Sequence, residues 1–263
     1  MTTPGTVFLI GAGPGDPELL TLKALRVLQS ADVVVHDRLV SREILALIPA
    51  TTHKISVGKE AGFHSVPQSE INGILVTLAQ HGMTVARLKG GDPLIFGRGS
   101  EEAEVLEENG IPVRYIPGIT AAQGAASTTG VPLTHRGLAS GVRYVTGHRA
   151  ANATLDLDWD GLAHPDTTLV LYMGAANLDE LARELLARGR PAATPALAIP
   201  SPTTPREARI VSTLDRIGGD ARQSGLAAPV LFIVGQVVSL YRDNPAAVPA
   251  RLWAEAPKAV ANA

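Results

Sequence analysis

The first 130 residues alternate short apolar segments with helical patterns, and this alternation is what most restricts the folds open to the chain. Strands are predicted at residues 7–10, 32–36, 55–57, 84–88 and 113–116. Apolar residues recur at helical spacing over residues 67–81, and Gly82 is placed to end that helix. Strands that alternate with helices predict a parallel, doubly wound sheet in an α/β domain.

Capping residues indicate where other helices of this part begin. Asp16 is suited to cap a helix over residues 17–30, and Ser100 to cap a helix that ends near residue 109. A shorter helix is predicted at residues 41–48. Each of these helices lies between two predicted strands, as the doubly wound arrangement requires.

The segment VPLTHR at residues 131–136 marks the predicted boundary between two domains. Beyond it, strands are predicted at residues 142–146, 168–172, 196–199 and 230–234, and a helix at 177–188. We therefore expect an N-terminal α/β domain over residues 1–133, a C-terminal α/β domain over residues 134–245 and a weakly ordered tail over residues 246–263.

Composition excludes several classes of protein. The 23 basic and 25 acidic residues create no overall field that would attract nucleic acid. The absence of cysteine rules out disulfides and thiolate zinc sites, and suits a reducing cytoplasm. The start of the chain lacks the features of a signal peptide, and the longest apolar run, residues 230–241, is too short to span a bilayer. We expect a soluble cytoplasmic protein without a membrane partner.

Unusual polar and glycine-rich residues follow each of the five predicted strands. The segments are GAGPGD, HDR, VGK, KGGDP and PGIT, in chain order. Because ligands bind outside the carboxyl ends of parallel strands, all five loops are expected to line one edge of the sheet. This convergence predicts a ligand site there.

The segment LKGGDPLIFGRGSEE, residues 88–102, is the most specific of these motifs. Its four glycines allow the main chain to take positive φ angles and to approach a ligand closely. Arg98 stands between two of the glycines and is suited to hold a carboxylate through two hydrogen bonds. Glu101 has two open roles, as a ligand-facing residue or as an acid that stabilises a helix N-terminus.

The first loop, GAGPGD, also allows a nicotinamide-dependent oxidoreductase, since Gly11 and Gly13 supply half of a dinucleotide motif. An acid, Asp16, stands at the third glycine position and would repel a pyrophosphate, and Pro14 removes a backbone donor. These two residues make the dinucleotide interpretation the weaker one.

Asp37 and Lys59 end neighbouring predicted strands, so either is placed to serve as an acid or a base near the ligand. A salt bridge between them is an equal alternative. The isolated histidines, including His135 and His148, show no spacing that would indicate a metal site.

The motifs VFLIGAGPGDPELLTLKALRVLQSADVVVHDRLV, VGKEAG, LKGGDPLIFGRGSEE, PGITAA, GVPLTHR and VTGH, in this order, resemble uroporphyrinogen-III C-methyltransferases of the tetrapyrrole methylase superfamily. The resemblance runs from about residue 6 to residue 240 and is most specific in the first 150 residues. It implies two α/β domains with S-adenosylmethionine in the cleft between them, usually a homodimer, and no metal. It also implies methylation of uroporphyrinogen III at two ring carbons, C2 and C7, to give precorrin-2 for sirohaem or cobalamin biosynthesis.

The resemblance assigns expected roles residue by residue. The cofactor-binding positions correspond to Pro14, Gly90, Gly91, Asp92, Ile95, Thr120, Ala121, Met173 and, more weakly, Pro202. Asp37 matches the family's proposed proton acceptor and Lys59 its proposed proton donor, and Arg98 is the third catalytic candidate. The residues that face the tetrapyrrole correspond to Arg98, Glu101 and Arg136, with Arg38 and Arg149 as secondary candidates.

Some features of the sequence differ from the family pattern. The second domain has IPSPTTP where the family presents a small residue near the cofactor, and Leu94 and Ser100 replace a common phenylalanine and glycine. The chain lacks the dehydrogenase and ferrochelatase module of fused sirohaem synthases, so we expect methyl transfer alone. The alternatives are another methylase of the superfamily, such as a later corrinoid methylase, and a binder of tetrapyrrole or cofactor that has no turnover.

Overall fold

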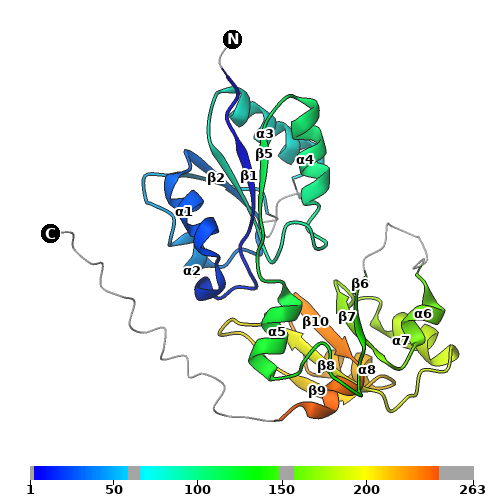
Figure 1. Ribbon diagram of the computed structural model, residues 1–263. Helices are drawn as coiled ribbons and strands as arrows, with labels where there is room; N and C mark the ends of the chain where they lie inside the picture. Colours follow the sequence, from blue (N-terminus) through cyan, green and yellow to red (C-terminus); the bar gives the residue numbers. More distant parts are fainter. Residues whose placement is uncertain (1–2, 59–65, 148–156, 243–263) are drawn as a thin grey trace. The chain divides into compact units, whose positions relative to one another are not determined.

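The structure is a computed structural model that describes residues 3–58, 66–147 and 157–242 (Figure 1). Contacts between residues divide the chain into two compact units. Unit 1 comprises the described residues up to Gly124 together with Pro202–Thr204. Unit 2 comprises the described residues from Ala125 to Ser201 and from Pro205 onward.

Unit 1 is built on a five-stranded parallel sheet with the strand order β3-β2-β4-β1-β5. The strands are β1 (Val7–Gly11), β2 (Val33–His36), β3 (His53–Ser56), β4 (Val85–Lys89) and β5 (Val113–Ile116). Every neighbouring pair runs parallel. The predicted parallel sheet is therefore confirmed, and its strands lie within two residues of the predicted positions.

Helices cover both faces of this sheet, as a doubly wound arrangement requires (Figure 1). They are η1 (Pro17–Leu19), α1 (Leu22–Ser30), α2 (Arg42–Leu45), α3 (Gln68–Gln80) and α4 (Gly99–Glu108). Residues of α1 and α2 pack in one apolar cluster with Ile10, Val34 and Leu88. Residues of α3 and α4 pack in a second cluster with Leu9 and Val85. Alternate residues of β1 and β4 thus serve opposite cores.

Two helix starts differ from the prediction. The expected helix over residues 17–30 is divided, because Asp16 caps only the 3-10 turn η1 and the Thr21 side chain caps α1 through the amide of Ala24. Ser100 was expected to be a cap but lies inside α4. This helix begins at Gly99, whose amide donates to the Pro93 carbonyl at 2.9 Å.

Unit 2 contains a mixed five-stranded sheet with the strand order β6-β7-β10-β8-β9. The strands are β6 (Gly141–Thr146), β7 (Thr167–Tyr172), β8 (Pro195–Pro200), β9 (Ile210–Thr213) and β10 (Val230–Val234). Only β6 and β7 are parallel, and the other three pairs are antiparallel. The helices are α6 (Trp159–Ala163), α7 (Leu178–Ala187), α8 (Ile217–Gln223) and the 3-10 helix η2 (Gln236–Leu240).

Helix α5 (Ala121–Thr129) begins in unit 1 and continues into unit 2, since the division falls after Gly124. The sequence placed the domain boundary later, at the VPLTHR segment. The apolar run at residues 230–241 is divided between β10 and η2. Across the described residues, no helix combines the length and the apolar character needed to cross a membrane.

Candidate functional site

The carboxyl ends of the parallel strands bring the polar loops of unit 1 to one sheet edge, as predicted. GAGPGD follows β1, Asp37 follows β2, KGGDP follows β4 and PGIT follows β5. Most of the loop after β3 lies outside the described residues, and Lys59 with it. The candidate site is therefore built from four loops, those after β1, β2, β4 and β5.

Backbone hydrogen bonds join the loop after β1 to the loop after β4. The Gly13 amide donates to the Gly91 carbonyl at 3.1 Å, and the Gly91 amide donates to the Gly13 carbonyl at 2.7 Å. A Cβ atom at Gly118 would lie 2.2 Å from the Gly91 carbonyl oxygen, and one at Gly11 would lie 2.5 Å from the Gly118 nitrogen. The main chains of three loops thus meet at a distance that only glycine allows.

Gly91 differs from these glycines in what surrounds it. Its φ angle is 68°, and a Cβ atom added there would meet no other atom within 4 Å. The backbone at Gly91 therefore needs glycine for its left-handed conformation and borders open space. This combination suits a ligand that lies directly against the main chain.

Asp92 fixes the geometry of the same loops. One carboxylate oxygen accepts from the Gly118 amide at 3.0 Å, and the other accepts from the Leu94 amide at 2.8 Å. A side chain from the loop after β4 thereby holds the backbone of the loop after β5. Within this structure, the role of Asp92 is to hold the two loops together.

The turn from residue 93 to residue 99 uses its glycines differently from our expectation. Gly97 and Gly99 do not have positive φ angles, whereas Phe96 and Arg98 do, with φ values of 52° and 57°. The two glycines are required because a Cβ atom at either would lie within 2.7 Å of the Pro93 carbonyl oxygen. The turn therefore packs against itself. It leaves three apolar side chains exposed, those of Leu94, Ile95 and Phe96.

Arg98 and Glu101 form an exposed ion pair at the start of α4. The Nε of Arg98 is 3.1 Å from both Glu101 oxygens, and a second guanidinium nitrogen is 2.6 Å from one of them. Both side chains are 54% exposed. Their hydrogen bond raises the pKa of Arg98 and lowers the pKa of Glu101. The sequence predicted a carboxylate clamp at Arg98, and in the structure Glu101 supplies the carboxylate that it holds.

A buried cluster of four charged groups lies behind the edge, and the sequence did not predict it. Its members are Asp37, Arg87, Lys89 and Glu102, which we call the ion cluster. Arg87 donates to Asp37 at 2.6 Å and to both oxygens of Glu102 at 3.0 and 3.1 Å. Lys89 lies 2.6 Å from Glu102 and 3.7 Å from Asp37. Two cations and two anions balance each other in charge.

Burial and charge interactions in the ion cluster shift the pKa values of three of its members. Burial disfavours the charged forms of Arg87 and Glu102, but their mutual attraction and their other partners overcome it, so the pKa of Arg87 is raised and the pKa of Glu102 is lowered. Burial, together with the nearby Arg87 charge, lowers the pKa of Lys89. Asp37 is 31% exposed, whereas the other three side chains are at most 5% exposed. Asp37 is thus the outward-facing end of the cluster.

The remaining candidates of unit 1 lie close to the loop after β1. Thr120 and Gln123 cap the start of α5 reciprocally, and Ala121 is its first residue. Pro14 packs over Gly124, where a Cβ atom would lie 2.8 Å from the proline ring. Pro202 is buried, and its neighbour Thr203 accepts a hydrogen bond from the Asp16 amide at 3.2 Å.

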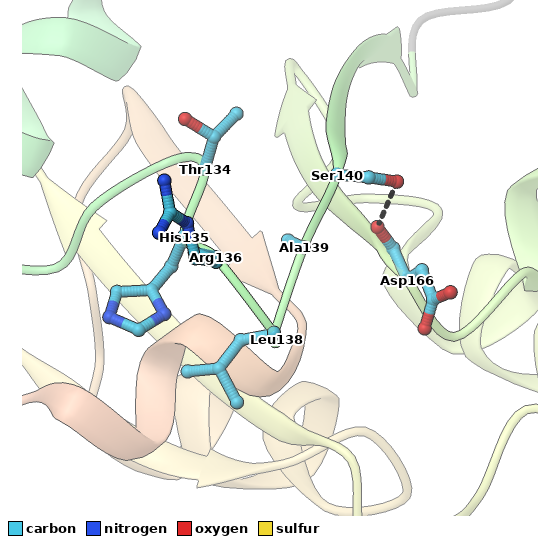
Figure 2. Close-up of a pocket in the computed structure, with 8 residues that line it drawn as sticks. Thr134, His135, Arg136, Leu138, Ala139, Ser140 and Asp166 are labelled. Carbon is cyan, nitrogen blue, oxygen red and sulfur yellow. Dashed lines mark hydrogen bonds between the residues drawn. The ribbon is translucent and has the colours of Figure 1, made fainter.

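Unit 2 holds two of the sequence candidates. Met173 directly follows β7, is 52% exposed and has a φ angle of 52°. Arg136 is exposed and lines an open hollow of about 560 Å³ (Figure 2). The turn that carries Arg136 is closed by hydrogen bonds between the backbones of His135 and Ala139. The secondary candidate Arg149 lies outside the described residues, as does His148.

A group of three or more side chains that could hold a metal ion is not found among the described residues. The signal that could have revealed the ion cluster is the pattern of β4, VARLK. It places two cations on one face of a strand that is otherwise apolar. Such cations need buried acids on the covering helix, and Glu102 of α4 is the acid that meets them.

Known proteins of one family are similar to this chain over nearly its whole length. The family described as Tetrapyrrole (Corrin/Porphyrin) Methylases matches residues 6–218. A uroporphyrinogen-III C-methyltransferase of Paracoccus denitrificans (strain Pd 1222) is 61% identical over 249 residues, which are 95% of this chain and 86% of that protein. A siroheme synthase of Methylobacillus flagellatus is 50% identical over 90% of this chain, and the chain spans only 50% of the length of that protein.

Solved structures agree with the sequence comparison. The crystal structure of a uroporphyrin-III C-methyl transferase from Thermus thermophilus, complexed with S-adenyl homocysteine, has a TM-score of 0.76 and 41% identity. The structural alignment covers 90% of this chain and 100% of the Thermus thermophilus chain. The match extends through both units, and the family's sequence pattern covers well over half of the chain. This chain therefore belongs to the tetrapyrrole (corrin/porphyrin) methylase family.

Proposed function

We propose that this chain is an S-adenosylmethionine-dependent C-methyltransferase that converts uroporphyrinogen III to precorrin-2 by methylating C2 and C7. The observation that carries the proposal is the 61% identity, over 95% of the chain, to a uroporphyrinogen-III C-methyltransferase. The product would serve sirohaem or cobalamin biosynthesis.

The loops at the sheet edge fit the cofactor. The open space at Gly91 leaves its main chain accessible to a ligand, and the tight backbone packing of Gly11 and Gly118 holds the neighbouring loops in place. The proposed cofactor residues are Pro14, Gly90, Gly91, Asp92, Ile95, Thr120, Ala121, Met173 and Pro202. Asp92 would act mainly by holding the loops that contact the cofactor, because its carboxylate is already bonded to two backbone amides.

Arginines would hold the acidic substrate. Uroporphyrinogen carries several carboxylates, and a chain with nearly balanced charge needs individual cations to bind them. Arg98 and Arg136 are both exposed, and Glu101 accepts hydrogen bonds from the Arg98 guanidinium. A substrate carboxylate would compete with Glu101 for Arg98 or share that guanidinium. Arg38 is also exposed and remains a secondary candidate.

S-adenosylmethionine, when bound, supplies a methyl group to a nucleophilic pyrrole carbon, so that a C–C bond forms as the S–CH₃ bond breaks and its electron pair stays on sulfur. The protein contributes by orienting the two reactants, which accounts for much of the rate in such transfers. The methylated ring then releases a proton. Asp37 is the proposed acceptor, since it is a partly exposed carboxylate at the sheet edge that does not hold loop amides as Asp92 does. Lys59 remains the proposed donor from the sequence.

We further propose a cytoplasmic homodimer that binds neither nucleic acid nor membrane. The family resemblance supports the dimer. The lack of cysteine and the balanced charge of the chain support a cytoplasmic enzyme that acts on a small molecule.

The test is to incubate the protein with S-adenosylmethionine and anaerobically prepared uroporphyrinogen III, and to follow the tetrapyrrole by mass spectrometry. The expected result is the addition of one and then two methyl groups, with one S-adenosylhomocysteine formed for each. Cofactor binding without any gain in tetrapyrrole mass would overturn the proposal, and it would favour another tetrapyrrole substrate or a binder without turnover.

A further inference from the structure

The arrangement of the ion cluster, formed by Asp37, Arg87, Lys89 and Glu102, suggests that its buried members orient Asp37 rather than mainly stabilise the fold. Buried ion pairs often add little to stability compared with apolar residues of similar volume. Here three charged side chains are almost fully enclosed, and the fourth, Asp37, is partly exposed at the carboxyl edge of the sheet. The three buried groups are therefore connected by ion pairs to Asp37, the proposed proton acceptor.

Glu102 holds the centre of this arrangement. Its two oxygens accept from Nε and one terminal nitrogen of Arg87 at 3.1 and 3.0 Å, a two-point contact that fixes the plane of the guanidinium. The same terminal nitrogen donates to Asp37 at 2.6 Å. The orientation of the Asp37 carboxylate is thus set by Arg87, and that of Arg87 by Glu102.

Glu102 is itself held from two further directions. Lys89 donates to one of its oxygens at 2.6 Å, and Gln68 of α3 donates to the same oxygen at 3.2 Å. The side chain is fully buried. Residues of β4 and α3 therefore fix a carboxylate of α4 that is too deeply buried to reach a substrate.

We infer that Glu102 is a positioning residue for methyl transfer: through Arg87 it holds the Asp37 carboxylate at the sheet edge in the orientation that accepts the proton. This inference rests on the proposed function, because it gives Asp37 a task in that reaction. It adds to the family resemblance a buried residue that touches neither substrate nor cofactor.

The variant Glu102→Gln tests the inference. Glutamine has nearly the same shape, but an NH2 donor replaces one of the two acceptor oxygens, so the two-point contact in which Arg87 donates to two separate oxygens is lost. We expect kcat to fall by about tenfold to a hundredfold, as for other misplaced catalytic groups, while the affinity for S-adenosylmethionine changes by less than about twofold. The matched control is Glu104→Gln, an exposed residue of the same helix, which should leave both quantities unchanged.

A double-mutant cycle with Asp37→Asn separates positioning from general structural support. If Glu102 acts through Asp37, adding Glu102→Gln to the Asp37→Asn protein should change kcat by less than about twofold. An equal loss of kcat in both backgrounds would overturn the inference, because damage to the fold does not depend on Asp37.

A second variant covers the case in which Glu102→Gln does not fold. Glu102→Gln combined with Lys89→Gln removes one charge of each sign and keeps the ion cluster balanced, while Arg87 still loses its two-point contact. We expect the same loss of kcat, and full turnover in this variant would overturn the inference. If the wild-type protein itself were inactive, the proposed methyltransferase function would be wrong. That result is distinct from an active wild type whose Glu102 variants keep full activity, which would contradict only the positioning role.

Discussion

The Asp92 carboxylate accepts a hydrogen bond from the Gly118 amide at 3.0 Å, so one side chain from the loop after β4 sets the position of the loop after β5. Its second oxygen accepts from the Leu94 amide at 2.8 Å and holds the start of the exposed apolar turn. The same carboxylate thus links the backbone that is proposed to bind the cofactor to the segment that leads to Arg98.

Replacement of Asp92 should therefore weaken cofactor binding through the loops. Asp92→Ala removes two hydrogen bonds to backbone amides and should lower the free energy of unfolding by about 1–3 kcal/mol. We expect the dissociation constant for S-adenosylmethionine, measured by calorimetry, to rise by about tenfold or more. Glu104→Ala is the control, since that side chain is exposed on α4. A cofactor affinity unchanged in Asp92→Ala would argue against the role of these loops.

Gly91 and Gly110 form a matched pair for testing the cofactor surface. Their φ angles are 68° and 69°, and a Cβ atom would meet nothing within 4 Å at either position. Alanine should therefore cost each site a similar backbone strain of about 1–2 kcal/mol. Only Gly91 lies at the carboxyl edge of the sheet, because Gly110 follows the end of α4.

We expect Gly91→Ala to bind S-adenosylmethionine about tenfold more weakly or worse, and Gly110→Ala to bind it normally. Thermal unfolding of both variants shows whether the strain is equal, and equilibrium binding then isolates the effect of the added methyl group. Equal affinities in the two variants would place the cofactor elsewhere.

Arg98 should matter for the substrate and little for stability. Exposed ion pairs contribute about 0–1 kcal/mol, so Arg98→Ala should unfold at nearly the wild-type temperature. Loss of a clamp for a substrate carboxylate should reduce kcat/KM for uroporphyrinogen by about tenfold or more, with cofactor affinity unchanged. Arg222→Ala is the control, since Arg222 is 63% exposed and paired with Asp179. Equal kcat/KM values for the two variants would remove Arg98 from substrate binding.

Local patterns were sufficient to predict the five strands of unit 1 and the edge of the sheet where their loops meet. The parallel sheet follows from strands alternating with helices, and the convergence of GAGPGD, KGGDP and PGIT follows from the parallel direction of the strands. Strand β9 and helices α6 and α8 were missed because they are too short to show a clear period. Strand β9 has only four residues, half of them polar, α6 has five residues, and α8 has seven that include two glycines.

The ion cluster could not be predicted because its partners are set by packing between elements. Arg87 and Lys89 share one face of β4 by simple alternation, but the sequence does not specify which acid covers that face. Glu101 and Glu102 are equally acidic residues of the first turn of α4, and one is exposed while the other is fully buried. The rotation of α4 about its axis decides that Glu101 faces outward and pairs with Arg98, whereas Glu102 faces the sheet and contacts Arg87.

The ion cluster also predicts how stability depends on pH. The pKa of Glu102 is lowered in the folded protein, because attraction to Arg87 and Lys89 exceeds the cost of burial. A carboxyl group with a lower pKa in the folded state stabilises that state above its unfolded pKa, near pH 4.5, and loses this contribution as the pH falls through the folded pKa. Glu102→Gln should therefore lower the free energy of unfolding by about 3 kcal/mol at pH 7, because two buried cations lose a partner.

The difference between wild type and Glu102→Gln should shrink as the pH falls below 4.5, since the carboxyl group is protonated first in the unfolded wild type and then, as the pH passes its lowered pKa, in the folded protein. Urea unfolding at a series of pH values measures this difference directly. Glu104→Gln, whose side chain is exposed, should follow the wild-type curve throughout. If the difference for Glu102→Gln stayed constant down to pH 3, the charge of Glu102 would not be the source of its stabilising effect.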